Sequence, residues 1–88
     1  MKAARALTLQ RSIVPRSERA KYMHKLRARR AYYTSANCRF WVFEESDLAG
    51  AFIEFISAED PAILVRAIAE APESLLDAGR IYQEVELE

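Results

Sequence analysis

The sequence predicts an α+β domain whose elements run in the order β-α-β-β-α-β. Stretches that alternate apolar and polar residues lie near both ends of the chain, and two strand-like stretches follow one another in the middle. Two stretches with helical periodicity separate the outer strands from this central pair. At 88 residues the chain has the length of one small domain. We place that domain over residues 1 to 88 and expect residues 1 to 6 to be flexible.

The first strand and the first helix are predicted in the N-terminal half. Residues 7 to 14 alternate with the period of a strand, and Pro15 ends it. No helix breaker occurs from Ser17 to about Ala36, and Asn37 belongs to the residue types that end helices in the left-handed conformation. The apolar stripe of this helix consists of Tyr22, Leu26 and Tyr33, with Met23 at its margin.

A hairpin is predicted after the helix. Residues 38 to 45 are rich in aromatic and β-branched side chains, which favour strands, and residues 51 to 56 form a second such run. The loop between them contains Gly50 and has a length typical of hairpins. Because this loop could hold four or five residues, the register is open by one. Glu54 is therefore expected opposite either Val42 or Trp41.

A second helix and a last strand complete the order. Asp60 and Pro61 are typical of a helix start, the aspartate as N-cap and the proline in the first turn. The predicted apolar face consists of Ile63, Leu64, Ala67, Ile68 and Ala71. After a loop over residues 77 to 80, residues 81 to 87 alternate again and predict a strand.

This order predicts a ferredoxin-like fold, with a four-stranded antiparallel sheet and both helices on one face. The other face of such a sheet is normally polar. In the predicted hairpin, however, residues 40 to 43 and most of residues 51 to 56 are apolar at successive positions. Both faces therefore require cover, either from the sheet of a second subunit or from a ligand or nucleic acid.

The whole layout resembles the dimeric α/β-barrel superfamily. The resemblance is carried by residues 36 to 44, 50 to 55 and 82 to 87, and as a pattern it spans about residues 7 to 87. The superfamily includes antibiotic-biosynthesis-type monooxygenases, muconolactone isomerases and haem-degrading oxygenases. The resemblance implies a homodimer in which two sheets close into a barrel that holds a small hydrophobic ligand.

The sequence departs from the haem-degrading members, which use an Asn, a Trp and a helical His around the haem. Here the first strand has no Asn and the second helix has no His, so no catalytic residue is carried over and no cofactor is expected. The single histidine, His24, and the single cysteine, Cys38, lie on different elements and do not form a metal site. His24 is expected at the surface, and Cys38 is expected to be buried.

Glu54 is the candidate catalytic residue, because an ionised carboxylate in the middle of an apolar strand is costly unless it is paired. It could act as a base in a pocket, or it could form an ion pair with Arg11 or Arg39 on a neighbouring strand, which is the favoured interpretation. The candidate ligand-binding residues are Arg11, Arg39, Trp41, Tyr22 and Tyr33. The arginines would anchor a carbonyl or carboxylate, and Trp41 would form an apolar wall.

The charges divide the chain into two halves. Residues 1 to 43 hold eleven bases and one acid, for a net charge of +10, and residues 44 to 88 hold two bases and twelve acids, for a net charge of −10. A basic helix suggests a nucleic-acid surface, but acids nearby and the zero net charge argue against it. We therefore expect the first helix to meet acids from the C-terminal half.

One cysteine excludes an internal disulfide and favours a reducing compartment, so a cytoplasmic protein is expected. No uncharged run approaches the ~20 residues that span a bilayer, and no membrane partner is expected. The predicted function is a small homodimeric barrel protein that binds a small, largely apolar molecule and could act as a cofactor-independent monooxygenase or isomerase. A non-catalytic protein-interaction module is the alternative, and RNA binding is the third.

Overall fold

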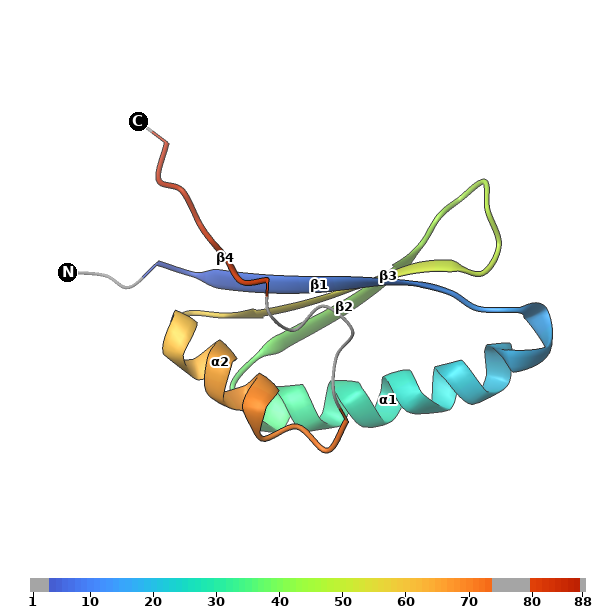
Figure 1. Cartoon of the computed structure of the whole chain (residues 1–88), viewed down its shortest axis with the longest axis horizontal. Coiled ribbons are helices and arrows are strands. Elements are labelled where there is room, and N and C mark those ends of the chain that lie inside the picture. Colours follow the sequence, from blue (N-terminus) through green and yellow to red (C-terminus); the bar gives the residue numbers. More distant parts are fainter. Residues whose placement is uncertain (1–3, 74–79, 88) are drawn as a thin grey trace.

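The computed structural model describes residues 4 to 73 and 80 to 87, and it confirms the ferredoxin-like β-α-β-β-α-β order (Figure 1). Its four strands form one antiparallel sheet in the order β2-β3-β1-β4. Both helices lie on the same side of the sheet, and the other side is open (Figure 1). The elements are β1 (Ala6–Ile13), the short 3-10 turn η1 (Arg16–Glu18), α1 (Arg19–Ser35), β2 (Arg39–Glu44), β3 (Ala51–Ala58), α2 (Pro61–Ala69) and β4 (Tyr82–Gln83).

The predicted end of α1 and the predicted start of α2 are confirmed, whereas α1 begins at Arg19 after a 3-10 turn and α2 ends at Ala69, before the predicted Ala71. Asn37 adopts a left-handed φ of 63° after α1, and the chain then turns so that the Cys38 amide donates to the Tyr33 carbonyl over 2.9 Å. At the start of α2 the Asp60 carboxylate accepts a 2.7 Å hydrogen bond from the Ala62 amide, with Pro61 in the first turn. These local signals fix where the helices meet the sheet.

The register of the central hairpin is settled. Glu54 of β3 lies opposite Val42 of β2, not Trp41, and on its other side it lies opposite Gln10 of β1. Side chains at paired positions point to the same face of a sheet. Glu54, Val42 and Gln10 therefore share the face that the helices cover.

The last strand is shorter than the predicted residues 81 to 87. Only Tyr82 and Gln83 pair with β1, opposite Leu7 and Ala6, and one further hydrogen bond joins the Glu84 amide to the Arg5 carbonyl. The ladder ends there because β1 itself begins at Ala6. In the part of the chain that the structure describes, residues 84 to 87 leave the sheet and project away from it (Figure 1). The predicted loop over residues 77 to 79 lies outside the described residues.

The core lies between the sheet and the helices. Its buried apolar side chains include Tyr33 of α1, Ile56 of β3 and Leu64 of α2, and the Tyr33 ring stacks parallel to Phe40 with centroids 6.3 Å apart. Cys38 is also buried, as predicted. The predicted face of α2 is narrower than expected, because Leu64 and Ala67 are buried whereas Ile63 is 38% exposed. The α2 helix packs against β3 and β1.

The molecule is flatter than a self-contained domain of its size. Its principal extents are 48 × 31 × 19 Å and its radius of gyration is 13.9 Å, against roughly 12 Å for a compact domain of this length. Its accessible surface is 6706 Å², against roughly 5300 Å² for a compact monomer of this mass. The uncovered face of the sheet contributes to the thin layer and to the excess surface, and so do residues 84 to 87, which project away from the sheet.

Candidate functional site

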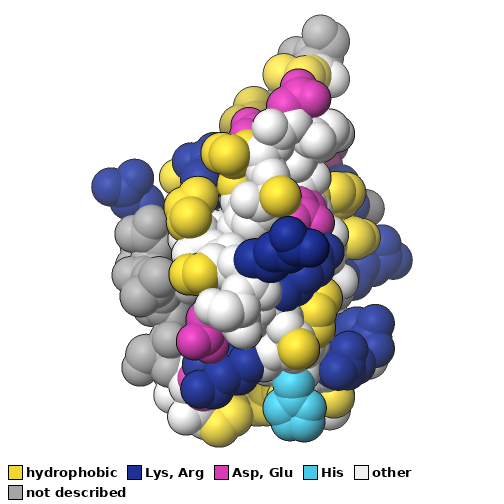
Figure 2. All heavy atoms as spheres, turned by 90° about the vertical axis from the view of Figure 1, so that its right-hand side faces the viewer, with side chains coloured by type: hydrophobic (Ala, Val, Ile, Leu, Met, Phe, Trp, Pro, Cys, Tyr) yellow, Lys and Arg dark blue, Asp and Glu magenta, His cyan; other side chains and the backbone are white. Residues whose placement is uncertain are grey.

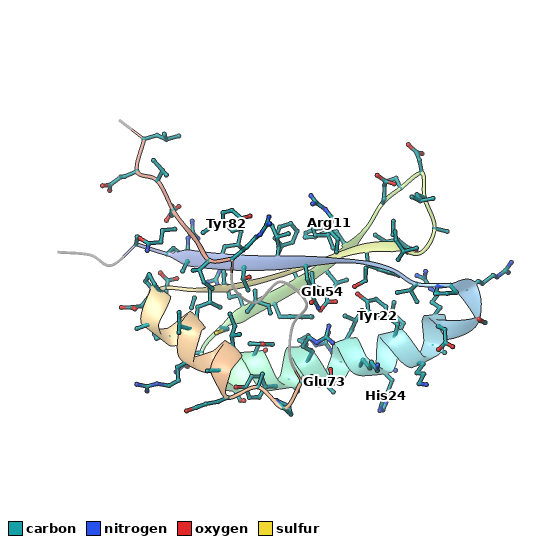
Figure 3. The ribbon with its side chains drawn as sticks, viewed as in Figure 1. Arg11, Tyr22, His24, Glu54, Glu73 and Tyr82 are labelled. Carbon is teal, nitrogen blue, oxygen red and sulfur yellow. The ribbon has the colours of Figure 1, made fainter. Side chains whose placement is uncertain are left out.

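A buried carboxylate cluster lies between the sheet and α1 (Figure 3). Glu54 is 1% exposed. Its Oε2 atom accepts hydrogen bonds from the Tyr22 hydroxyl over 2.8 Å and from Gln10 Nε2 over 3.1 Å. Its Oε1 atom is paired with Arg29 Nη1. The second Arg29 nitrogen, Nη2, reaches the more exposed Glu73 over 3.1 Å.

Two strands and one helix position this cluster. Tyr22, Leu26, Arg29 and Tyr33 recur at the spacing of one helical stripe, so α1 directs all four toward the sheet. Gln10 is placed by its pairing opposite Glu54. Arg29 and Gln10 are the members that the sequence interpretation omits. The spacing of Arg29 from Leu26 and Tyr33 was the available signal, since it places the guanidinium within the buried stripe.

The predicted partner of Glu54 is wrong. Neither Arg11 nor Arg39 pairs with it, because both point away from the helices. Arg11 lies opposite Ile53 and Arg39 opposite Ser57, and the pleat places these odd-numbered positions on the face away from Glu54. Figure 3 shows Arg11 and Glu54 on opposite sides of the sheet. The ion pair is formed across layers, with α1, and not between neighbouring strands.

The charged and polar groups of this cluster are paired with one another. Burial raises the pKa of the Tyr22 phenol, and the hydrogen bond and charge of Glu54 raise it further, so Tyr22 remains a donor. Burial alone would lower the pKa of Arg29, but Glu54 and Glu73 outweigh this effect and raise it. Both Glu54 oxygens are occupied by donors, which leaves this carboxylate poorly suited to take a proton from a substrate.

A cavity of about 250 Å³ opens beside the cluster, between α1 and residues 71 to 73. Arg29, Tyr33 and Glu73 line it, together with Ala28 and Pro72. The Tyr33 hydroxyl is buried, and it has no hydrogen-bond partner among the described residues. Burial raises the pKa of Tyr33 to about 12. The structure thus brings Glu54, Tyr22 and Tyr33 to one side of the sheet, and a cavity lies next to them.

The remaining candidates lie on the open face of the sheet. The side chains of this face form rows across the strands: Phe43, Ile53 and Arg11, then Trp41, Phe55 and Leu9, then Arg39, Ser57, Leu7 and Tyr82. Trp41 is 40% exposed and Phe43 is 55% exposed. A shallow hollow of about 280 Å³ lies on this face and is lined by Leu7, Trp41 and Tyr82 among others. Arg11, Arg39 and Trp41 are therefore separated from Glu54 by the sheet.

The basic helix meets acids from the C-terminal half, as predicted. Arg19 pairs with Glu44 over 2.7 Å, and Arg29 pairs with both Glu54 and Glu73. Arg27 and Arg30 are exposed and form no ion pair within the described residues. Toward the end of the molecule where α1 begins, Lys and Arg side chains form separate groups, with uncharged and hydrophobic surface between them and a few acidic side chains nearby, and not one continuous basic patch (Figure 2).

His24 is exposed, as predicted, and points from α1 away from the sheet (Figure 3). Burial raises the pKa of the Cys38 thiol, which makes it less reactive. Within residues 4 to 73 and 80 to 87, no three His, Cys, Asp or Glu side chains are grouped so that they could hold a metal ion. Neither α1 nor α2 combines the length and the hydropathy that a bilayer-crossing helix needs.

We compared the chain with models of protein families, with curated proteins and with solved structures. No family model matches it. None of the curated proteins and none of the solved structures matches it either. Two surfaces of the molecule are candidates for binding, the open face of the sheet and the cavity beside α1.

Proposed function

We propose that the chain is the subunit of a homodimeric α/β barrel of the superfamily that its sequence resembles, and that the dimer binds a small, largely apolar molecule. The observation that carries the proposal is the apolar open face of the sheet. The exposed aromatic side chains of this face, Trp41, Phe43 and Tyr82, stand beside Leu7, Leu9, Ile53 and Phe55. An apolar patch of this extent on a small protein marks an interaction site.

The open face offers surface that a second copy could cover. A typical stable interface removes about 800 Å² from each partner, and Trp41, Phe43 and Tyr82 are each at least 40% exposed on this face. The charges also favour self-association. The face carries Arg11 and Arg39, whereas the loop that rises beside it carries Glu45 and Asp47 (Figure 1). Two copies facing each other would offer acids to each other's arginines.

The proposed ligand lies in the hollow beside Trp41. In a monomer this hollow of about 280 Å³ is open, and a facing sheet would enclose it. The proposal concerns binding rather than a reaction, because the Glu54 carboxylate is saturated by its own partners on the other side of the sheet. A monooxygenase or isomerase activity would need another acid or base.

The only tryptophan of the chain makes the proposal testable. In sedimentation experiments we expect a species of twice 10.1 kDa. Dilution should shift the Trp41 fluorescence to longer wavelength as this half-exposed ring becomes solvated. Phe43→Ser should favour the monomer, whereas Val65→Ser, at an exposed position of α2 on the other side of the sheet, should not. A wild-type chain that stays monomeric at micromolar concentration would contradict the proposed homodimer.

The second candidate is a non-catalytic module that binds a different protein through the same face. The extended segment after β4 favours this candidate, because Val85 and Leu87 are 75% and 89% exposed and contribute nothing to the core of the described chain. A monomer in sedimentation that still keeps the native fold would favour the module over the dimer.

A further inference from the structure

We propose that the segment after β4, residues 85 to 87, docks as an additional strand along the outer edge of β2 in a second copy of the chain. The inference rests on the homodimer proposed above and deepens it, because it names the segments through which the two copies meet. The sheet order is β2-β3-β1-β4, so β3 and β1 lie between β2 and the segment within one copy. Only a second copy can therefore bring this edge and this segment together.

The outer edge of β2 offers backbone groups without partners. The Glu45 amide donates to the Ala51 carbonyl over 2.9 Å, and hydrogen-bonded pairs alternate along an antiparallel ladder. In the observed register the odd-numbered residues of β2 therefore bond to β3, whereas the amides of Phe40 and Val42 point away from it. No strand of the described chain pairs with this edge. Such a row of unpaired amides and carbonyls is a template for an added strand.

Residues 85 to 87 have the pattern of a strand whose apolar side chains are uncovered. Val85 and Leu87 are 75% and 89% exposed, with Glu86 between them. Glu84 stays on its own copy, since its amide donates to the Arg5 carbonyl and its carboxylate pairs with the Arg5 guanidinium, each over 2.7 Å. Beyond it the chain extends to the side of the sheet opposite the helices, where the open face lies (Figure 1). A copy packed on the open face would meet this segment.

The directions of the strands suit this exchange. Each step across the sheet is antiparallel, so β2 and β4 run in opposite directions. When two such sheets pack open face to open face about a two-fold axis parallel to the strands, the β4 edge of each copy lies over the β2 edge of the other. The segment after β4 then runs antiparallel to β2 of the second copy. The symmetry repeats the same contact at the other side of the dimer.

The flank of α1 beside β2 is basic. Arg19 marks this flank, because it pairs with Glu44 at the end of β2 over 2.7 Å. Arg30 follows Arg19 by eleven residues, or about three helical turns, and so lies on the same flank, with Arg27 one turn before it. Both Arg27 and Arg30 are exposed and form no ion pair within the described residues. An acidic side chain on an added strand would meet two cations there.

The sequence of the segment matches both faces of the extended sheet. Neighbouring side chains of a strand point to opposite faces. When Val85 and Leu87 face the space between the two sheets, they extend the apolar rows that include Trp41, and Glu86 faces the side of the helices, near Arg30. The reverse orientation would expose both apolar side chains and place the Glu86 carboxylate between the sheets. The first orientation is therefore the one that the residues favour.

The first test measures amide hydrogen exchange in the full chain above and below the concentration at which it dimerises. We expect the amides of Phe40 and Val42 to exchange about tenfold or more slowly in the dimer than in the monomer, because only the docked segment covers them. The Trp41 amide, which bonds to β3, is the internal control and should be protected in both states.

The second test exchanges charges between the two copies. Glu86→Arg should weaken the dimer about three- to thirtyfold, because each dimer contains the contact twice, and less so in high salt. Arg30→Glu should weaken it similarly, and the two substitutions in one chain should restore most of the affinity. Lys25→Glu is the matched control, since it makes the same charge change on the other flank of α1, beside the cavity. It should neither weaken the dimer nor compensate Glu86→Arg.

The outcomes separate this inference from the homodimer itself. A dimer that Glu86→Arg and Arg30→Glu leave unchanged, or in which the Phe40 and Val42 amides exchange as fast as in the monomer, would overturn the docking and leave the homodimer intact. A loss of affinity that the double variant does not restore would overturn the pairing of Glu86 with Arg30. A wild-type chain that stays monomeric would overturn both proposals and favour the protein-interaction module.

Discussion

Glu54 illustrates how one residue can be recognised as unusual while its environment is misjudged. A carboxylate in the middle of an apolar strand requires a partner, and this part of the prediction needed no structure. The identity of the partner depended on the pleat, because a shift of one position in register moves a side chain to the other face. Arg29 was the correct partner, and its position in the stripe of Leu26 and Tyr33 could have indicated this. Gln10 could be found only once β1 was paired with β3.

Substituting Glu54 tests its structural role. In Glu54→Gln the carboxylate is neutral, so the guanidinium of Arg29 loses its buried partner. We expect unfolding by urea to require about 2 to 4 kcal/mol less free energy. Arg29→Met in the same chain should recover part of this loss, because it removes a partly buried guanidinium that keeps only the more exposed Glu73 as its partner. A single variant as stable as the wild type would contradict the role assigned to the pair.

Glu44 provides a pH test at the residue scale. The hydrogen bond from Arg19 lowers the pKa of Glu44 to about 2, and the Gly50 amide contributes. Since the folded pKa lies below the ordinary value of 4.5, the stabilisation is complete above pH 4.5 and is lost as the pH falls toward 2. In urea melts, the wild type should lose stability over this range, and Glu44→Gln should lose less. Equal pH profiles for the two chains would contradict the assignment.

At the scale of elements, the local signals predicted the helices and the hairpin well. Asp60, Pro61 and Asn37 act on their immediate neighbours, so the sequence around them contains most of the information needed. The length of β4 could not be predicted from such local signals. Residues 81 to 87 have the alternation of a strand, but strand length also depends on the partner, and β1 begins at Ala6. The alternation of apolar and polar residues shows that a segment can form a strand, but it does not show with which strand the segment pairs or over how many residues.

Gly50 connects two elements, and substituting it tests that connection. Its φ is +89°, and a Cβ at this position would clash with the Val14 carbonyl oxygen. The Val14 amide donates to the Gly50 carbonyl over 2.8 Å, which joins the end of β1 to the hairpin. We expect Gly50→Ala to lower the free energy of unfolding by about 2 kcal/mol or more. The control is Ala49→Ser, at an exposed neighbour, which should change it by less than about 0.5 kcal/mol.

At the scale of the whole molecule, the charge asymmetry and the open face have different consequences. The opposite charges of the two halves are partly matched within the monomer, through Arg19 with Glu44 and Arg29 with Glu54 and Glu73. The apolar face is not covered by any other part of the described monomer. A thin sheet covered on one side leaves little core for its length, so a partner would contribute a large part of the stability. Folding and association should therefore be coupled.

This coupling predicts a melting temperature that depends on protein concentration. If the open faces of two copies pack together, mass action favours the folded dimer, and the midpoint of thermal unfolding should rise with each tenfold increase in concentration. Phe43→Ser, which removes a 55% exposed ring from the face, should reduce this dependence and lower the midpoint. In a monomer, the exposed Phe43 ring would contribute little to stability, and its removal would leave the midpoint of thermal unfolding unchanged. A wild-type midpoint that stays constant over two decades of concentration would show that the sheet is stable with its face uncovered, which contradicts the dimer.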